Sequence, residues 1–378
     1  MEPIPFNVPY LAGNEKRYMD EVFSNLHFAG NGPFTKRVQD LLEEMISAPR
    51  VLLTHSCTAA LEMAALLHDL GPGDEVIIPS YTFVTTASSM MRTGAKVVFC
   101  EIDPETMLID VDDAALRITD RTKAIVPVHY AGFTPPILEL EEICKPKGIA
   151  IIEDAAQALG TLFDGLPSSR NSPLTTISFH ETKNIHSGLG GCLIINNPEF
   201  IGRAEMIWER GTNRSEFFKG LVDKYTWKEL GSSFYPTEFQ AAFLLAQLEN
   251  MDANLTIRRA LWNAYEEAFI VHENRGLLRI LRPPKNCNDN AHMFAILLPT
   301  SEIADKVRIH LNDNGVNATI HYVPLHASAM GERMGMKPAD LPITLDASSR
   351  LVRLPLHHEL KIEDIQFIAS LLFFFTDL

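Results

Sequence analysis

A single lysine separates a short alternating stretch from a run of small residues in TTISFHETKNIHSGLGG, residues 175–191. The alternation from Thr176 to Phe179 predicts a strand, and the glycines that follow predict a turn. Burial or a neighbouring cation lowers the pKa of a lysine, and the neutral amine can then form a Schiff base with an aldehyde. Because lysines usually lie in water, this stretch alone favours a solvated loop residue over a chemical role for Lys183.

An acidic pair follows an apolar run in IAIIEDAAQALG, residues 149–160. The run predicts a buried strand that ends at Glu153 and Asp154, with Gln157 one helical turn further on. Ligands of α/β proteins bind at the carboxyl ends of the parallel strands. A carboxylate there needs a cation or a strong donor, because burying an unpaired charge is costly. Asp154 could instead cap the following helix, and this stretch alone does not decide between the two.

A third stretch, THSCTAAL at residues 54–61, joins the end of a predicted strand to the start of a predicted helix. The first N–H groups of a helix have no partner within it, and the helix dipole is positive at that end. With the hydroxyl groups of Ser56 and Thr58, such a turn is suited to bind a phosphate, although an ordinary helix cap would look the same. The sequence contains neither a Walker A motif nor the G-x-G-x-x-G pattern of dinucleotide sites.

Together the three stretches match the needs of pyridoxal 5′-phosphate, which takes a phosphate anchor, a carboxylate for its pyridine nitrogen and a Schiff-base lysine. Asp154 and Lys183 are 29 positions apart (183 − 154), which leaves room for a helix and another strand. Phe83, in PSYTFVTT just after a further predicted strand, is available to stack on the ring. The combination favours Lys183 as a reactive residue.

Short strands rich in valine and isoleucine alternate with helical stretches between about residues 50 and 200. This pattern predicts βαβ units and an α/β fold with a mostly parallel sheet. Residues 236–269 predict one or two long helices that lead towards a second, smaller α/β domain. We expect a large domain at residues 1–250, including an N-terminal arm, and a small C-terminal domain at residues 251–378.

The composition is that of a soluble globular protein, with 378 residues of which 46% are hydrophobic and 21% charged. A net charge of −15 argues against nucleic acid or an anionic membrane as the main partner. The five scattered cysteines favour free thiols in a reducing cytoplasm, and His357 and His358 lack a third ligand at metal spacing. The sequence shows no signal peptide and no apolar run long enough to span a bilayer. We therefore expect a cytoplasmic protein without a metal.

Four stretches, PGDEVIIPSYTFVTTA, VPVHYAG, IIEDAAQALG and SFHETKN, resemble the DegT/DnrJ/EryC1/StrS family of sugar aminotransferases. The resemblance covers nearly the whole chain. It implies fold type I of the pyridoxal-phosphate enzymes, with a sheet of the seven-stranded type flanked by helices. It also implies a homodimer whose active sites lie at the subunit interface.

The resemblance assigns a role to each candidate residue. Lys183 matches the Schiff-base lysine and Asp154 the partner of the pyridine nitrogen. Gln157 lies near the phenolic oxygen of the ring, and Phe83 stacks on it. The implied phosphate contacts are Ser56, Thr58 and Ser178, with the backbone of Cys57, Thr58 and Ala59.

The sequence departs from the family pattern at Cys57, where the family often has glycine, in the stretch PSSRNSPLTTI at residues 167–177, and at two further positions. The asparagine that reaches across the dimer to the partner's phosphate is Ser233 here, and a hydroxyl could still make that contact. The glutamate that usually precedes the two glycines after the lysine is Leu189.

A narrower resemblance in GTNRSEFFKGLVDKYTWKELGSSF and in NAHMF…IHYVPLH implies the substrates. They are L-glutamate as amino donor and the C4 keto group of dTDP-4-keto-6-deoxyglucose as acceptor, in surface polysaccharide biosynthesis. Basic residues of the first stretch are candidates for the diphosphate, and residues of the second for the sugar. These substrate candidates are Arg214, Lys219, Lys224, His321, Tyr322 and His326.

Other functions remain open. A 3-aminotransferase acting on dTDP-3-keto-6-deoxyhexose fits the same residues, because regiochemistry depends on how the sugar lies over the cofactor. A non-catalytic pyridoxal-phosphate sensor or regulator would need a partner module that the sequence does not show. A sugar 3-dehydratase of the family has histidine in place of Lys183, and a nicotinamide-dependent oxidoreductase would need the missing glycine fingerprint.

Overall fold

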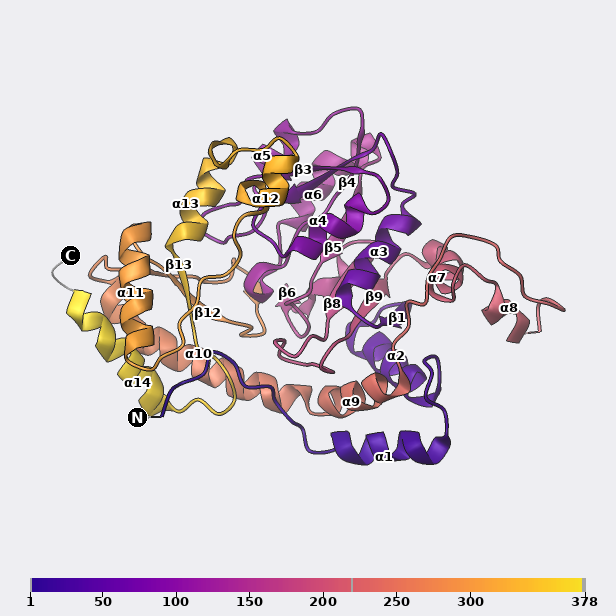
Figure 1. Cartoon of the computed structure of the whole chain (residues 1–378), viewed down its shortest axis with the longest axis horizontal. Helices are drawn as coiled ribbons and strands as arrows, with labels where there is room; N and C mark the ends of the chain where they lie inside the picture. The colour runs from indigo at the N-terminus through magenta and orange to yellow at the C-terminus, as the bar shows by residue number, and fades with distance from the viewer. Residues whose placement is uncertain (1, 219, 376–378) are drawn as a thin grey trace.

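A seven-stranded sheet forms the centre of the larger part of the computed structural model, which describes residues 2–218 and 220–375 (Figure 1). All its strands run parallel except β9, which is antiparallel to both of its neighbours. This confirms the predicted α/β fold with a mostly parallel sheet. In spatial order the strands are β1 (Arg50–Thr54), β9 (Gly191–Ile195), β8 (Leu174–Ser178), β5 (Ala150–Asp154), β4 (Thr122–Ile125), β2 (Glu75–Pro79) and β3 (Lys96–Cys100).

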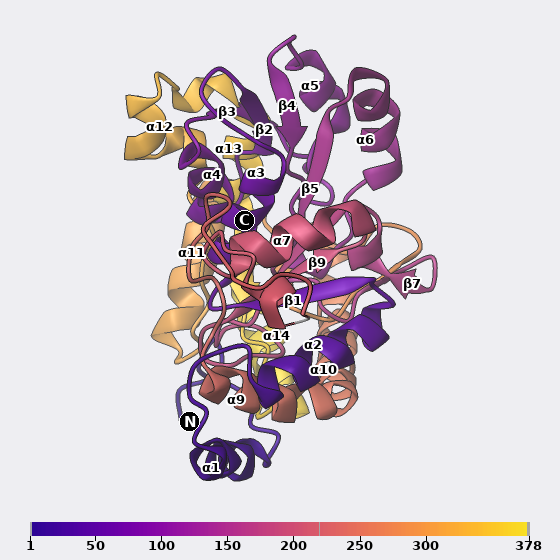
Figure 2. The ribbon, with the colours of Figure 1, turned by 90° about the vertical axis from the view of Figure 1, so that its right-hand side faces the viewer.

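Both faces of this sheet are buried, because alternate side chains of each strand enter different hydrophobic clusters. In β1, Leu52 packs with α3, α4 and α7, whereas Val51 and Leu53 pack with α1, α2 and α9. Figure 2 shows α7 and α2 on opposite sides of β1. The period of two in side-chain direction explains why these strands read as continuous apolar runs.

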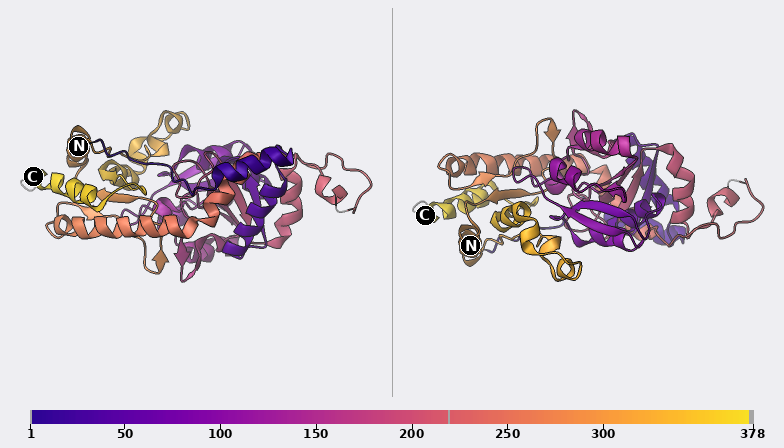
Figure 3. Two further views of the ribbon diagram at one scale, coloured as in Figure 1. Left: turned by 90° about the horizontal axis from the view of Figure 1, so that it is seen from below. Right: turned by 90° about the horizontal axis from the view of Figure 1, so that it is seen from above.

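Eight helices precede the long connector to the C-terminal region in the described part of the chain. They cover the sheet, apart from α1, which packs on α9 (Glu238–Glu249), and α8, which belongs to a projecting loop (Figure 3). Their bounds are α1 Glu15–Asn25, α2 Pro33–Ile46, α3 Cys57–Leu67, α4 Val84–Met91, α5 Val111–Leu116, α6 Ile137–Cys144, α7 Ile201–Trp208 and α8 Arg214–Phe218.

The predicted helical connector is two helices, α9 (Glu238–Glu249) and α10 (Met251–Glu273). Thr237 caps α9 through a capping box with Gln240. Asn250 separates the two helices and caps α9 through its backbone N–H. The break falls at the predicted boundary between residues 250 and 251, and α10 then packs against the C-terminal helix α14. We keep the two-domain division as a proposal.

The C-terminal region has its own three-stranded antiparallel sheet in the order β10–β12–β13. The helix α11 follows Thr300, and most of HYVPLH, residues 321–326, is irregular backbone. The elements are β10 Arg279–Ile280, β11 Cys287–Asn288, β12 Phe294–Leu297, α11 Ser301–Asp313, α12 Ala329–Arg333, α13 Pro342–Arg350, β13 Leu351–Leu354 and α14 Ile362–Leu371. No helix in the described residues has the length and apolar character needed to cross a membrane.

Two links tie this region to the rest of the chain. β11 pairs with β6 (Leu162–Phe163), which also pairs with β7 (Leu166–Pro167). At the other side, the N-terminal segment runs back along the molecule, and Ile4 forms a bridge with Val316 (Figure 1). The start of the chain therefore belongs spatially to its C-terminal part.

The start of β9 lies unusually close to the first turn of α3. A Cβ atom added to Gly191 would lie 2.4 Å from the backbone nitrogen of Cys57 and 2.5 Å from the carbonyl carbon of Ser56. Only glycine allows this approach, because both clashing atoms belong to the backbone. The glycine after the lysine loop thus sets the distance between β9 and the start of α3.

We predict that Gly191→Ala lowers the free energy of unfolding by about 1–3 kcal/mol, because the added methyl group must push β9 and α3 apart. Chemical denaturation of purified protein measures this change. Gly202→Ala is the control, since an added Cβ meets no atom within 4 Å there and alanine favours the helix α7. Equal stability of the wild-type protein and the Gly191→Ala variant would contradict this account.

Candidate active site

The predicted phosphate-binding turn is formed where β1 ends and α3 begins. Ser56 has an extended backbone, and its hydroxyl accepts a hydrogen bond from the N–H of Ala59 at 3.1 Å. The N–H groups of Cys57 and Thr58 precede the first hydrogen bond of the helix and are available to a ligand. Ser178, at the end of β8, lies near this turn because β9 pairs with both β1 and β8.

Asp154 ends β5 as a buried carboxylate with two protein donors. It accepts hydrogen bonds from the hydroxyl of Thr86 at 2.7 Å and from the N–H of Ala156 at 3.2 Å. Burial raises the pKa of Asp154, and these bonds and the nearby Lys183 partly oppose the rise. A cation bound beside Asp154 would offset the cost of burying its negative charge.

The neighbouring acid, Glu153, has a different role. It does not line the cavity, and it forms a fully buried pair with His129, whose Nε2 lies 2.7 Å from Glu153 Oε2. Of the two acids predicted at this strand end, only Asp154 faces the site.

Lys183 lies in the turn that follows β8, where its N–H donates to the carbonyl of His180 at 2.8 Å. Burial lowers the pKa of Lys183, and Arg353 adds to this effect, whereas Cys57 and Asp154 oppose it. The amine therefore loses its proton more readily than that of a solvated lysine, as nucleophilic chemistry requires. The solvated-loop interpretation is thus disfavoured by the geometry.

Aromatic and amide side chains form another wall of the site. Gln157 accepts a hydrogen bond from the N–H of Ala131 at 2.7 Å and donates to the hydroxyl of Tyr322 at 3.1 Å. The ring of His321 stacks on Tyr322, with 3.6 Å between centroids. Phe83, just after β2, is 54% exposed, which leaves its ring free to stack on a bound ligand.

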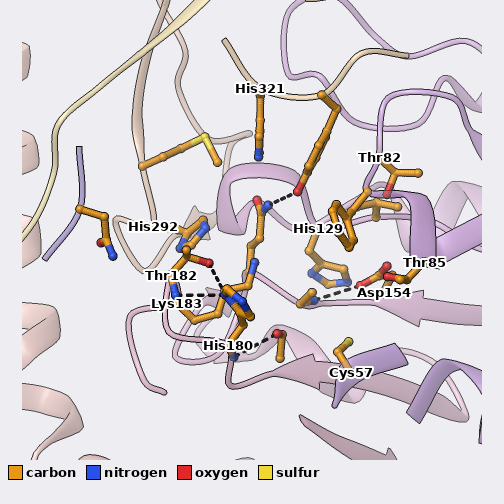
Figure 4. A pocket seen from close by; sticks show the side chains of 18 of the residues that line it. Cys57, Thr82, Thr85, His129, Asp154, His180, Thr182, Lys183, His292 and His321 are labelled. Atoms are coloured by element: carbon orange, nitrogen blue, oxygen red, sulfur yellow. Dashed lines mark hydrogen bonds between the residues drawn. The ribbon is translucent and has the colours of Figure 1, made fainter. Parts of the chain in front are cut away.

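These groups share one cavity of about 510 Å³ between the large sheet and the C-terminal region. Figure 4 shows Lys183, Asp154, Cys57 and His321 around it. The sequence-predicted residues that line the cavity are Ser56, Cys57, Thr58, Phe83, Asp154, Gln157, Ser178, Lys183, His321 and Tyr322.

Two other predicted residues lie behind this wall. Ala59 is buried in α3, and its N–H donates to the hydroxyl of Ser56. His326 is fully buried, with Nδ1 2.7 Å from the hydroxyl of Ser80 and Nε2 3.2 Å from the carbonyl of Pro338. Because both its ring nitrogens have protein partners, His326 holds the loop rather than contacting a ligand in the cavity.

The remaining candidates come from the segment around α8, which projects from the body at the end opposite the two termini (Figure 3). Ser233 does not line the cavity, and its hydroxyl accepts a hydrogen bond from Arg210 at 3.3 Å. Arg214 approaches Glu209 at 4.0 Å, and Lys224 is also outside the cavity lining. Lys219 lies outside the described residues. A role for these residues in a partner's site stays a prediction.

The cavity also contains residues that sequence reasoning missed: His129, Arg258, His292 and Arg353. Arg258 and Arg353 come from α10 and β13, and no local motif marks them. His292 follows β11 and lies in NAHMF, a stretch that supported the narrower resemblance but to whose histidine no role was assigned. His129 lies in VPVHYAG, so its motif was recognised but its contact with Glu153 was not. Long-range packing brings all four to the site.

The donor set fits pyridoxal 5′-phosphate. A turn of free N–H groups and hydroxyls suits its phosphate, a buried carboxylate suits its protonated ring nitrogen, and an amine of lowered pKa suits its aldehyde. Gly191 supports this fit, because its missing side chain lets β9 approach the phosphate-binding turn.

Known proteins match this chain over nearly its full length. A 4-aminotransferase for dTDP-4-dehydro-2,3,6-trideoxy-D-glucose from Saccharopolyspora spinosa is 29% identical and covers 97% of this chain and 95% of its own. A pleiotropic regulatory protein from Geobacillus stearothermophilus is 30% identical, with coverage of 96% and 97%. The fold matches the putative sugar aminotransferase Spr1654 from Streptococcus pneumoniae with a TM-score of 0.91 at 24% identity, over 99% of each chain.

The family model described as DegT/DnrJ/EryC1/StrS aminotransferase family matches residues 9–373. Every α-helix and strand described above lies within the matched range, and so does the cavity lining except for Phe6 and Asn7. The chain therefore belongs to the DegT/DnrJ/EryC1/StrS aminotransferase family.

Proposed function

We propose that the chain is a pyridoxal-phosphate-dependent sugar-nucleotide aminotransferase. It takes an amino group from L-glutamate and places it on C4 of dTDP-4-keto-6-deoxy-D-glucose, which gives dTDP-4-amino-4,6-dideoxy-D-galactose. The observation that carries the proposal is the meeting of Lys183, Asp154 and the Ser56 turn in one cavity.

Each side chain at the site has a separate role, which follows from its charge and its position. Bound pyridoxal phosphate supplies an electron sink for the carbon that loses its proton. Lys183 Nζ, as base, takes that proton from the α-carbon of the amino donor and, as acid in the second half of the reaction, gives a proton to C4 of the sugar. With the cofactor bound, Asp154 would pair with its protonated ring nitrogen, and Phe83 and Gln157 would fix the orientation of the ring.

Two features support the substrate assignment. Tyr322 and His321 present a stacked polar pair at the cavity wall, suited to hydrogen bonds with a sugar. The Saccharopolyspora relative is named as a 4-aminotransferase of a dTDP-linked deoxysugar, which favours both C4 and the dTDP carrier. A 3-aminotransferase acting on dTDP-3-keto-6-deoxyhexose is the nearest alternative.

The projecting segment supports the proposed homodimer. It exposes large apolar side chains, with Trp227 77%, Leu221 71% and Leu230 66% exposed. Apolar surface of this kind usually marks a protein interface. In a dimer, this segment could bring Arg214, Lys224 and Ser233 to the partner's cavity. The free cysteines support a cytoplasmic location.

A second candidate function is regulatory, because one relative is named a pleiotropic regulatory protein. Such a protein would bind the same cofactor without turning over a sugar nucleotide. The lowered pKa of Lys183 and the open cavity favour catalysis, since a sensor has no need of a proton-transferring amine.

The reaction itself is tested by incubating the purified protein with pyridoxal phosphate, L-glutamate and dTDP-4-keto-6-deoxyglucose. We expect an amino sugar with nitrogen on C4 in the axial, galacto configuration, identified by NMR of the product. Nitrogen on C3 of the corresponding 3-keto substrate would establish the 3-aminotransferase. Cofactor binding without any amino sugar would favour the regulator.

Replacing the reactive lysine separates binding from chemistry. We predict that Lys183→Ala removes the visible absorbance of the lysine-linked cofactor and lowers the rate by about 10²- to 10⁴-fold, because no other amine can move the proton. Lys306→Ala is the control, since Lys306 is paired with Glu302 on the outer helix α11. A lysine-linked absorbance band that persisted in Lys183→Ala would show that another residue binds the aldehyde.

The pH dependence follows from the burial of Lys183. Burial disfavours the charged amine, so the pKa of Lys183 lies below the ordinary value of 10.5. At a given pH, a larger fraction of Lys183 is therefore neutral than of a solvated lysine. We predict that the rate of cofactor capture by the cofactor-free protein rises with pH and levels off below pH 10.5. Stopped-flow absorbance measures this rate. A free lysine derivative provides the reference, and an identical inflection in both would contradict the predicted shift.

A further inference from the structure

His292 enters the cavity from the connector that follows β11, and both its backbone and its ring are held. Arg258 donates from Nη2 to the carbonyl of His292 at 2.7 Å and from Nε to the carbonyl of Ala291 at 3.0 Å. Nδ1 of the imidazole lies 3.1 Å from Oδ1 of Asn184. Figure 4 shows His292 among the labelled side chains of the cavity. The imidazole is therefore held in one position before any ligand binds.

The hydrogen bonds of Asn184 decide which nitrogen of His292 carries the proton. Nδ2 of Asn184 donates to the carbonyl of Asn290 at 2.8 Å, and a carbonyl can only accept. The amide oxygen of Asn184 therefore faces His292, and this oxygen can only accept as well. Nδ1 of His292 must then be the donor. In a neutral imidazole the other nitrogen, Nε2, is in that case an acceptor.

Nε2 of His292 opens onto the cavity. It has no hydrogen-bond partner among the described residues, and yet it is not fully enclosed by them. Because His292 lines the cavity, a ligand bound there can reach this nitrogen. An acceptor whose role is fixed in this way selects a group that has a hydrogen to donate.

The charges around His292 keep its imidazole neutral. Three of the described residues that line the cavity are basic, namely Lys183, Arg258 and Arg353. The guanidinium of Arg353 lies over the ring of Phe6, 4.7 Å from the ring centroid. Burial and the three cations hold the pKa of His292 well below its usual range. The protonated form, in which Nε2 would be a donor, is therefore disfavoured.

Most groups expected in the cavity cannot donate a hydrogen bond to Nε2. Carboxylates and phosphates are acceptors, and the amino group of L-glutamate is the group that reacts. The protonated ring nitrogen of pyridoxal phosphate is suited to Asp154. The hydroxyl groups of a hexose are the donors that remain.

The contact with Asn184 favours the hexose over the nucleoside as the source of that hydroxyl group. Asn184 follows Lys183 directly in the chain, and its side chain holds the imidazole of His292. The imidazole therefore lies at the end of the cavity where the lysine reacts. The part of a sugar nucleotide that must reach this end is the hexose with its keto carbon.

We propose that His292 recognises a hydroxyl group on the hexose ring of the amino acceptor, which donates a hydrogen bond to Nε2. This makes His292 a specificity-determining residue for the sugar half of the reaction. The inference rests on the proposed function of the same cavity. It adds to that function the requirement that the acceptor keeps a hydroxyl group near its keto carbon.

Two substitutions separate the roles of the two ring nitrogens. His292→Asn keeps a donor for Asn184 near the position of Nδ1 and removes Nε2, whereas His292→Gln places an amide oxygen near the position of Nε2. His27→Asn is the control, because His27 is exposed and does not line the cavity. Each protein is assayed with dTDP-4-keto-6-deoxyglucose and with the 2,3,6-trideoxy acceptor of the Saccharopolyspora relative, which lacks the hydroxyl groups on C2 and C3.

We expect His292→Asn to lower kcat/KM for dTDP-4-keto-6-deoxyglucose by about 5- to 10-fold, as for the loss of one hydrogen bond. His292→Gln should recover part of this loss, and His27→Asn should match the wild type. With the trideoxy acceptor, and in the half-reaction with L-glutamate alone, His292→Asn should stay within about twofold of the wild type. An equal loss with both acceptors, a loss in the glutamate half-reaction alone, or no loss at all would overturn the proposal.

A measurement without turnover separates this inference from the proposed function. dTDP-D-glucose has ring hydroxyl groups but no keto group, and calorimetry compares its binding to the cofactor-loaded protein with the binding of dTDP. We expect His292→Asn to weaken the binding of dTDP-D-glucose by about 5- to 10-fold and to leave that of dTDP unchanged, even if the wild type forms no amino sugar. Equal binding of dTDP-D-glucose by the wild type and His292→Asn would overturn the inference even if the protein is an active aminotransferase.

Discussion

The site depends on the parallel run of β1, β5 and β8, which bring their carboxyl ends to one edge of the sheet. β1 leads into the Ser56 turn, β5 ends at Asp154, and β8 leads into the turn that carries Lys183. The strands are buried on both faces, so their ends are fixed by the same packing that stabilises the sheet. The positions of the acid and the lysine are therefore a consequence of the core.

The same burial sets the chemistry. It raises the pKa of Asp154 and lowers the pKa of Lys183, which brings the two pKa values closer together. Thr86 and the N–H of Ala156 limit the shift of the acid without neutralising it. Removing water from Asp154 and Lys183 destabilises their charged forms, and this same effect gives both groups their altered reactivity.

The sequence was sufficient for the parts of the site that lie next to strand ends, because a strand, a turn and a helix cap are local patterns. It predicted the mostly parallel sheet and placed Lys183, Asp154, Gln157 and the Ser56 turn in what the structure shows to be one cavity. It failed for Arg353 and Arg258, whose places in the cavity lining depend on which distant segments fold against them. His326 shows the opposite error. It lies in the same stretch, HYVPLH, as His321, but of the two only His321 lines the cavity.

The contact between Phe6 and Arg353 joins residues near the two ends of the chain. Contacts so distant in sequence form late, because the loop that they close is long. On the ribosome, the N-terminal segment must wait until β13 has been synthesised before it can settle along the C-terminal region. The cavity wall is therefore completed only when nearly the whole polypeptide has been made, and a truncated chain would carry the lysine and the acid in an unfinished pocket.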